Sequence, residues 1–297
     1  MIARTESQSF VADLGDLISL TKPRLSTMVL ATAAGGLYLA PGDISPLRAV
    51  VALITIAVTI AAANVLNCYI ERDSDRHMAR TSNRPLPAGR MEPAVALGFG
   101  LMLVLVAVPL MSLMVNRLTG LLGAIAFVSY VFVYTPLKAH SSVAVLVGGL
   151  PGALPPLMGW TAVTGTLDAG GLALFALMFC WQVPHFLAIA LFRQREYEAA
   201  GLTVTPLESG DASSRWQLFA WTLALLVSSV VPTWLGIAGN VYLVVAVLLG
   251  LGFIGLALHG AVRRLGPPWA RKTFAYSLAY LTGILVVLML DAAPRLG

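Results

Sequence analysis

Charged residues are scarce in this chain of 297 residues: they make up 11% of it, against roughly 25% in soluble globular proteins. Hydrophobic residues make up 58%. A surface that faces water needs more charge than this. The composition therefore excludes an ordinary soluble domain, a disordered chain and a nucleic-acid-binding protein, and it makes the lipid bilayer the main partner of the chain.

Cysteine is scarce as well. The only two cysteines, Cys68 and Cys180, stand far apart, in or beside apolar runs. Two residues are too few for a disulfide framework or a cysteine metal site. The net charge of +5 would suit a polyanion partner, but the positions of the charges decide that question.

What the chain has in plenty is long charge-free runs, and a membrane helix needs about 20 mostly apolar residues. The runs of at least 18 residues without charge are 25–42, 49–70, 93–116, 118–137, 139–167, 169–192, 216–262 and 273–290. The run 216–262 is too long for one helix, and turn residues at 235–240 divide it in two. The sequence therefore predicts an all-α polytopic membrane protein with nine transmembrane helices, in a single domain over residues 1–297.

The basic residues predict an orientation, because cytoplasmic loops carry an excess of Lys and Arg. Residues 1–23 are polar to amphipathic and resemble neither a signal peptide nor a transit peptide, so we expect a cytoplasmic N-terminal segment. With that end inside, 16 of the 19 basic residues fall on the inside, Arg4 among them, and only Arg48, Arg117 and Arg295 fall outside. The compact length favours the inner membrane of a bacterium over an organelle.

One loop concentrates the charge. Asn67, Glu71 and Asp75 stand four residues apart at the end of the second run, so a continuing helix stacks them on one face, with Asn64 beside them. Like charges at this spacing repel each other unless a cation lies against them. Hard oxygen ligands suit Mg²⁺, which takes one or two carboxylates together with substrate phosphates. The spacing therefore predicts a Mg²⁺ site.

Arginines follow the same spacing in the same loop. Arg72, Arg76, Arg80 and Arg84 recur every four residues. Pro85 is expected to break the helix, so the last one or two of these arginines are expected to lie in a loop. Arginine side chains bind phosphate and carboxylate groups in a bidentate manner. The two rows together predict a Mg²⁺–diphosphate site at the membrane surface. The alternative is a positive-inside loop whose carboxylates only pair with its arginines.

Two further polar segments fall on the same predicted side of the membrane. Residues 134–138 end the fourth run, and residues 181–186 lead through the sixth run into the polar segment 193–201. This convergence predicts an active site at that face. His185 lies about two turns inside the membrane. It can be an interhelical hydrogen-bonding residue, or it can bind a metal, orient a substrate or move a proton.

These segments resemble the UbiA superfamily of intramembrane prenyltransferases, and within it the branch that farnesylates haem. The segments that carry the resemblance are 21–24, 67–75, 83–87, 159–165 and 181–186. The resemblance implies a UbiA-like fold and the transfer of a farnesyl group from farnesyl diphosphate to a vinyl carbon of haem b. Diphosphate leaves, water quenches the cation on the porphyrin side, and haem O forms. It also implies haem A synthase or a terminal oxidase as assembly partners.

The resemblance also assigns roles to residues. Those expected to hold Mg²⁺ against the diphosphate are Asn67, Glu71 and Asp75, and these three with His185 are the expected catalytic residues. His185 is expected near the haem, as an axial ligand or a positioning residue. Residues expected to bind substrate are Arg24, Arg80, Arg84, Tyr134, Lys138, Arg193, Glu196 and Tyr197. Within this set Arg80, Arg84 and Lys138 would neutralise the diphosphate, and Arg24 or Arg193 would pair with the haem propionates.

One departure from the superfamily bears on the acceptor. The second acidic motif of the superfamily falls here at Arg193 and Tyr197, which cannot bind a cation as carboxylates do, so Glu196 is the possible second carboxylate. This loss argues against the alternative of a polyprenyltransferase acting on an aromatic acid or a quinone precursor. A haem or lipid transporter, the other alternative, would place its polar groups near the middle of the bilayer rather than at helix ends.

Overall fold

The computed structural model describes residues 14–78 and 80–293. The first thirteen residues of the expected N-terminal segment 1–23, with Arg4, and the C-terminal Arg295 lie outside these ranges. Within them the chain folds into helices and forms no β-strand, which confirms the all-α prediction.

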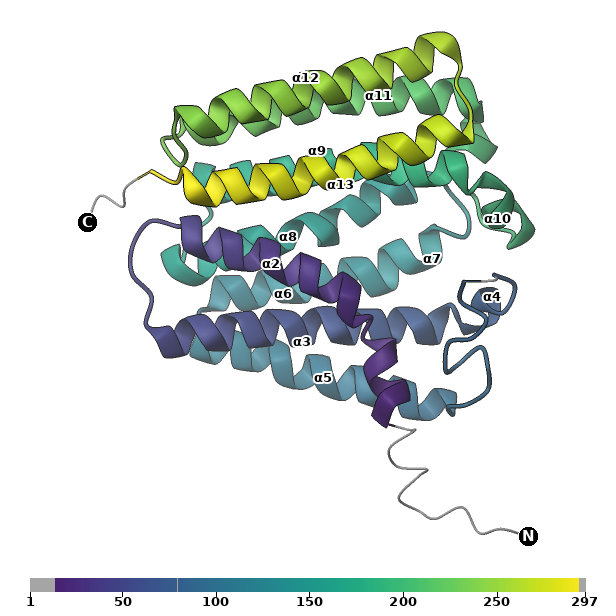
Figure 1. The fold of residues 1–297 in the computed structure, drawn as a ribbon. Helices are drawn as coiled ribbons and strands as arrows, with labels where there is room; N and C mark the ends of the chain where they lie inside the picture. The colour runs from purple at the N-terminus through teal and green to yellow at the C-terminus, as the bar shows by residue number, and fades with distance from the viewer. Residues whose placement is uncertain (1–13, 79, 294–297) are drawn as a thin grey trace.

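The charge-free runs correspond to the long helices (Figure 1). The helices are α2 (Pro23–Leu39), α3 (Pro46–Ile70), α4 (Arg72–Asp75), α5 (Pro93–Met114), α6 (Arg117–Val128), the π-helical η1 (Ser129–Tyr134), α7 (Thr135–Leu137), α8 (Ala144–Thr164), α9 (Ala169–Phe192), α10 (Gln194–Ala199), α11 (Thr205–Trp234), α12 (Asn240–Arg263) and α13 (Pro267–Leu290). The predicted break in the run 216–262 lies between α11 and α12, where Gly236 adopts the left-handed conformation with φ of 70° that glycine tolerates best.

Side-chain caps start three of the long helices. Ser45, Asn116 and Asp168 accept hydrogen bonds from backbone N–H groups three residues further on, which satisfies donors that a helix start otherwise leaves unpaired. These caps begin α3, α6 and α9.

Among the described residues, seven helical segments are long and apolar enough to cross a membrane. They are α3, α5, the continuous stretch Arg117–Leu137, α9, α11, α12 and α13. The chain is therefore a multi-pass membrane protein. α2 has only 17 residues, and α8 carries three prolines inside the helix, so nine spans remain a prediction.

Large apolar side chains on the outer helices point away from the bundle. Leu105 and Leu113 on α5 and Leu290 on α13 are 71%, 84% and 82% exposed. Exposed apolar side chains in this number are rare on proteins in water, whereas lipid tails are as apolar as leucine. These faces therefore suit contact with lipid.

The glycine- and proline-rich segment of α8 stays helical and packs backbone to backbone against α2. A Cβ atom on Gly159 would lie 1.9 Å from the Ala33 carbonyl oxygen, and one on Gly36 would lie 2.0 Å from that of Pro156. Small residues allow this approach between membrane helices. The close contact fixes α8 as one wall of the interior cavity described below.

Candidate functional site

The acidic loop, the end of α7 and the segment that includes α10 lie at the same end of the bundle (Figure 1). The helical hydrogen bonding of α3 carries on into the loop: the Glu71 N–H donates to the Asn67 carbonyl over 2.9 Å, and the Asp75 N–H donates to that of Glu71 over 2.8 Å. All three side chains are buried. Asn67, Glu71 and Asp75 therefore follow one another at helical spacing, as the sequence predicts.

Each of the two carboxylates in this row pairs with a cation from elsewhere in the chain. Lys138, directly after α7, places its Nζ 2.5 Å from Glu71 Oε1, and Arg84 donates from Nη1 to Asp75 Oδ2 over 2.6 Å. Burial lowers the pKa of the Lys138 ammonium, but Tyr134 and Glu71 raise it by more. The net pKa therefore lies above the ordinary value for lysine, and Lys138 stays charged.

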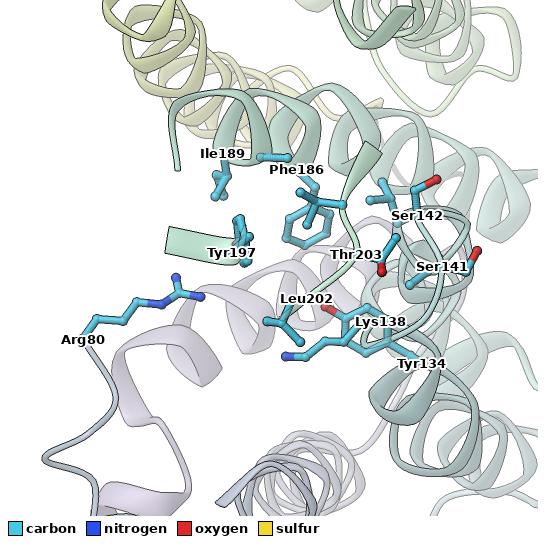
Figure 2. A pocket seen from close by; sticks show the side chains of 14 residues that line it. Arg80, Tyr134, Lys138, Ser141, Ser142, Phe186, Ile189, Tyr197, Leu202 and Thr203 are labelled. Atoms are coloured by element: carbon cyan, nitrogen blue, oxygen red, sulfur yellow. The ribbon is translucent and has the colours of Figure 1, made fainter. Parts of the chain in front are cut away.

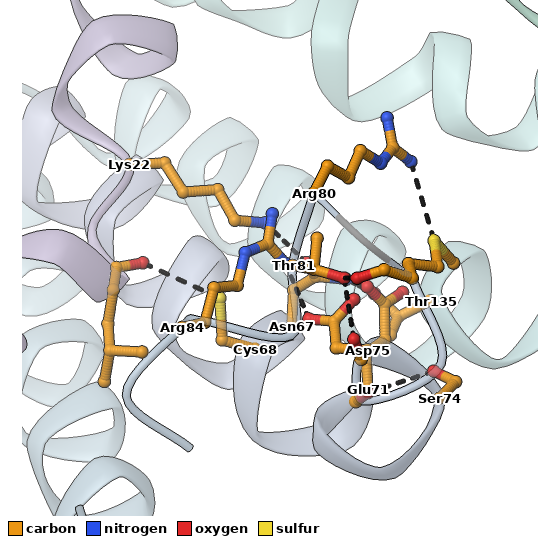
Figure 3. A network of polar contacts seen from close by, with 12 residues as sticks. Lys22, Asn67, Cys68, Glu71, Ser74, Asp75, Arg80, Thr81, Arg84 and Thr135 are labelled. Atoms are coloured by element: carbon orange, nitrogen blue, oxygen red, sulfur yellow. Dashed lines mark hydrogen bonds and ion pairs between the residues drawn. The ribbon is translucent and has the colours of Figure 1, made fainter. Parts of the chain in front are cut away.

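The side-chain amide of Asn67 makes a hydrogen bond through its oxygen and another through its nitrogen. The Lys22 Nζ donates to its Oδ1 over 2.7 Å, and its Nδ2 donates to Thr135 Oγ1 over 3.1 Å. Figure 3 shows these groups around the acidic row. The residue before α2 and the first residue of α7 thus meet at Asn67.

Sequence reasoning did not select Lys22. Its backbone lies in the left-handed region, with φ of 52° and ψ of 60°, which is uncommon for a residue other than glycine. Backbone strain of this kind concentrates at functional sites. The available signal was Pro23, because a residue before proline is disfavoured in the right-handed helical region, but it does not reveal the direction of the side chain.

The row of arginines is helical only at its start, and the last two arginines lie in the loop, as the expected break before Pro85 allows. α4 ends at Asp75, so Arg76, Arg80 and Arg84 lie beyond it. Arg72 and Arg76 lie 3.8 Å from the exposed carboxylate of Asp73. These outer pairs, and the pair of Arg84 with Asp75, correspond to the alternative interpretation of the loop, in which carboxylates pair with arginines.

The rest of the loop turns back onto the acidic row. The Thr81 hydroxyl donates to the Asp75 carbonyl over 2.9 Å, and the loop then brings Arg84 to the Asp75 side chain. Arg80 leaves the loop in the other direction and lies over the Tyr197 ring, with its guanidinium carbon 5.6 Å from the ring centroid. α10 is thereby joined to the acidic loop.

Two adjoining cavities lie inside this end of the bundle. The first has a volume of about 240 Å³, and Arg80, Lys138 and Tyr197 project around it (Figure 2). The second has about 280 Å³ and is lined mainly by apolar residues of α2, α3, α6, η1, α8 and α9. Tyr134 and Phe186 line both cavities, so a polar mouth leads into an apolar interior.

His185 lies apart from these cavities and does not line either of them. It is buried on α9, with Nδ1 2.7 Å from Ser277 Oγ on α13 and its ring stacked on Trp181 at 4.6 Å. The Ser277 hydroxyl donates to the Phe274 carbonyl over 2.6 Å, so it accepts from His185 Nδ1–H. Nε2 is then the lone-pair nitrogen. This is the interhelical hydrogen bond that the sequence leaves open, and the expected role near haem stays a prediction.

Three other predicted site residues, Arg24, Arg193 and Glu196, do not contact the acidic row. Arg24 is exposed in the first turn of α2. Arg193 pairs with Glu196 over 2.8 Å, and the Glu196 side chain is 52% exposed. The structure thus brings Tyr197 to the acidic loop but leaves Glu196 at the surface, and a second carboxylate site at Glu196 remains untested.

The residues of the acidic row fit Mg²⁺. Glu71 Oε1 is buried beside the Lys138 ammonium and accepts no hydrogen bond from any other described group. The described residues contain no group of three or more His, Cys, Asp or Glu side chains that could hold a metal. Two carboxylates and one amide suit an ion that keeps waters and takes its remaining oxygens from substrate phosphates.

The sequence pattern of the UbiA prenyltransferase family matches residues 28–281. The chain belongs to this family. Among its relatives in the family, a protoheme IX farnesyltransferase of Myxococcus xanthus is 60% identical, over 99% of this chain and 100% of the relative. A protoheme IX farnesyltransferase of Anaeromyxobacter dehalogenans is 49% identical, over 97% of both chains.

Solved structures confirm the fold. A digeranylgeranylglyceryl phosphate synthase superposes with a TM-score of 0.82 over 94% of this chain and 98% of its own, at 17% identity. A UbiA homologue from Archaeoglobus fulgidus bound to GPP and Mg²⁺ gives 0.66 over 92% and 99%, also at 17% identity. At this identity the likeness concerns the fold alone.

Proposed function

We propose that this UbiA-family enzyme transfers a farnesyl group from farnesyl diphosphate to a vinyl carbon of haem b, giving haem O and diphosphate. The observation that carries the chemistry is the buried row of Asn67, Glu71 and Asp75. The row adjoins the first cavity through Lys138, which pairs with Glu71 and lines that cavity. The full-length likeness to protoheme IX farnesyltransferases supports the choice of donor and acceptor.

The acidic row would hold Mg²⁺ through Asn67, Glu71 and Asp75, and the ion would act as a Lewis acid on the diphosphate. Three basic side chains of the chain would add positive charge around the diphosphate. Lys138 and Arg84 lie on the two carboxylates, and Arg80 projects into the mouth. Together they stabilise the negative charge that develops as the carbon–oxygen bond breaks and its electron pair leaves with the diphosphate.

The apolar cavity shields the farnesyl cation from water. Its walls near the mouth include Tyr130, Tyr134 and Phe186, which keep water from the allylic cation until the vinyl carbon attacks it. The new carbon–carbon bond leaves a cation beside the porphyrin. Addition of water and loss of a proton then give the hydroxyl group of haem O, so that the atoms balance.

The charge distribution supports an orientation in the membrane. We assign residues 1–297 to one membrane-embedded domain in the cell inner membrane, with the N-terminus and the acidic loop in the cytoplasm. The excess of basic residues on the side of that loop supports this orientation. Haem A synthase or a terminal oxidase would then receive the product.

The test uses membranes that contain the full chain. They are incubated with haem b, farnesyl diphosphate and Mg²⁺, and the haem is analysed by mass spectrometry. A farnesylated haem is expected. Parallel incubations supply an aromatic acid or a quinone precursor as acceptor. Prenylation of such an acceptor with unchanged haem would overturn the proposal in favour of an aromatic polyprenyltransferase, and transport of haem without any chemistry would favour a carrier.

A further inference from the structure

We propose that Met158 and Ile56 close the inner end of the apolar cavity and thereby set the length of prenyl donor that the enzyme accepts. The inference rests on the proposed function, because it assigns the apolar cavity to the hydrocarbon chain of the donor. It adds a specificity-determining pair to the site.

The lining residues give the depth of the cavity. On α8 they run from Gly148 to Met158, and on α3 from Asn64 to Ile56. At a rise of 1.5 Å per residue these stretches are about 15 Å and about 12 Å long. Both run away from the acidic row, since α3 ends at that row and α8 begins shortly after Lys138. Met158 and Ile56 are therefore the deepest lining residues on their helices.

Side chains rather than backbone form this inner end. Ile56 and Met158 are 0% and 2% exposed, and both belong to the apolar cluster that also contains Met111. The Met158 methyl reaches α6, where it lies 3.3 Å from the position a Cβ atom on Gly123 would take. Shortening either side chain deepens the cavity, and adding bulk there makes it shallower.

The dimensions suit a farnesyl chain. Its main chain has twelve carbons, and at about 1.5 Å per carbon–carbon bond an extended zigzag is about 14 Å long, close to the stretch on α8. A geranyl chain is one isoprene unit shorter and leaves the inner end empty, while a geranylgeranyl chain meets Met158. The volume of about 280 Å³ lies below the roughly 300–1,000 Å³ of pockets for drug-sized molecules, which favours a slender chain over a porphyrin.

The first arm of the test measures binding without an acceptor. Purified full-length protein in lipid nanodiscs is titrated with the non-reacting thiolodiphosphates of geranyl, farnesyl and geranylgeranyl, and the shift in melting temperature is recorded. The native chain is expected to favour farnesyl. Met158→Ala and Ile56→Ala are each expected to move the preference toward geranylgeranyl by about tenfold, since they make room for apolar surface to be buried. Met158→Phe is expected to move it toward geranyl.

A matched control separates cavity depth from loss of a buried methionine. Met178 on α9 is 6% exposed, belongs to a different apolar cluster and lines neither cavity. Met178→Ala removes the same atoms and is expected to keep the farnesyl preference. If neither folded alanine variant at Met158 or Ile56 changes the preference, the inference is wrong.

The second arm repeats the comparison by turnover, with haem b and equal amounts of the three diphosphates. Mass spectrometry of the haem gives the length of the attached chain. If haem is never prenylated but the binding preference follows Met158 and Ile56, the proposed acceptor is wrong and the inference stands. If haem is farnesylated but the variants at Met158 and Ile56 keep the native preference for chain length, the proposed function stands and the inference fails.

Discussion

The Lys22 ammonium donates a hydrogen bond to the amide oxygen of Asn67 over 2.7 Å, and none of the ion pairs among the described residues gives it a carboxylate partner. Lys138 and Arg84, its neighbours in the site, both have one. Burial lowers the pKa of Lys22, as expected for a partly desolvated ammonium group. Lys22 is thus the cation of this group with the most to gain from an anionic ligand.

Lys22→Met is expected to weaken binding of farnesyl thiolodiphosphate by about tenfold to a hundredfold, because a hydrogen bond to a charged group contributes about 1.5–3 kcal/mol. Calorimetric titration in nanodiscs measures this. Lys272→Met, which removes an exposed lysine on α13, serves as the control. Equal affinity in the two variants would contradict a role for Lys22 in diphosphate binding.

Glu71→Gln and Asp75→Asn are expected to abolish turnover and to leave the amount of protein in the membrane unchanged, because each removes a carboxylate from the proposed Mg²⁺ ligands. Both variants should also bind Mn²⁺, used in place of Mg²⁺, more weakly than the native chain does. Electron paramagnetic resonance measures this binding. Asp73→Asn is the adjacent control, since the Asp73 side chain is 69% exposed. Normal turnover in both test variants would refute the metal assignment.

Arg80→Ala is expected to raise the KM for farnesyl diphosphate about tenfold, and Tyr197→Leu to raise it less. The two changes should not add, because the ring positions the guanidinium through a cation–π contact that contributes about 0.5–2 kcal/mol. A double-mutant cycle measures the coupling. Arg195→Ala, an exposed arginine at the start of α10, controls for lost charge, and additive effects would argue against the contact.

Ser277→Ala is expected to weaken haem binding about tenfold, followed as a shift of the Soret band, because Ser277 fixes the His185 tautomer with a lone pair on Nε2 and partners of this kind typically contribute 10–100-fold to metal affinity. Affinity for the farnesyl thiolodiphosphate should stay as it is. Ser229→Ala breaks a different buried contact, with Tyr280, and should leave the Soret band unchanged. A native spectrum in Ser277→Ala would count against His185 as a haem ligand.

Gly159→Ala is expected to lower the melting temperature in detergent, because its Cβ would meet the Ala33 carbonyl oxygen at 1.9 Å and overpacking costs about 1–3 kcal/mol. Gly255→Ala is the control, because it adds a Cβ atom where there is room for it. It lies on α12 with no atom within 4 Å of an added Cβ, so the higher helix propensity of alanine, up to about 1 kcal/mol, should slightly stabilise the fold. Similar effects at both positions would mean that α2 and α8 can move apart.

The sequence predicted the long helices well because a charged side chain is costly inside a bilayer, so gaps between charges mark helices directly. The predicted run 169–192 coincides with α9 (Ala169–Phe192). The stacking of Asn67, Glu71 and Asp75 was also predictable, since it depends only on the local period of a helix.

Contacts across long stretches of sequence were not predictable in the same way. The position of Arg84 in a loop was expected, but its partner was not, because Arg84 folds back onto Asp75 nine residues away, where tertiary contacts outweigh helical periodicity. Lys22 reaches Asn67 across 45 residues, and His185 reaches Ser277 across 92. Periodicity carries no information about such pairs, because they depend on how α2 and α13 pack against the rest of the bundle.

The pairing of Glu71 with Lys138 and of Asp75 with Arg84 bears on how the site is assembled. Unlike a zinc finger, whose fold depends on its ion, this loop has counter-charges from its own chain, so we expect it to keep its shape without a metal. A chelator should therefore stop the enzyme without melting it. Under the proposed function, newly inserted protein would reach its final structure first and would take up Mg²⁺ with each incoming diphosphate.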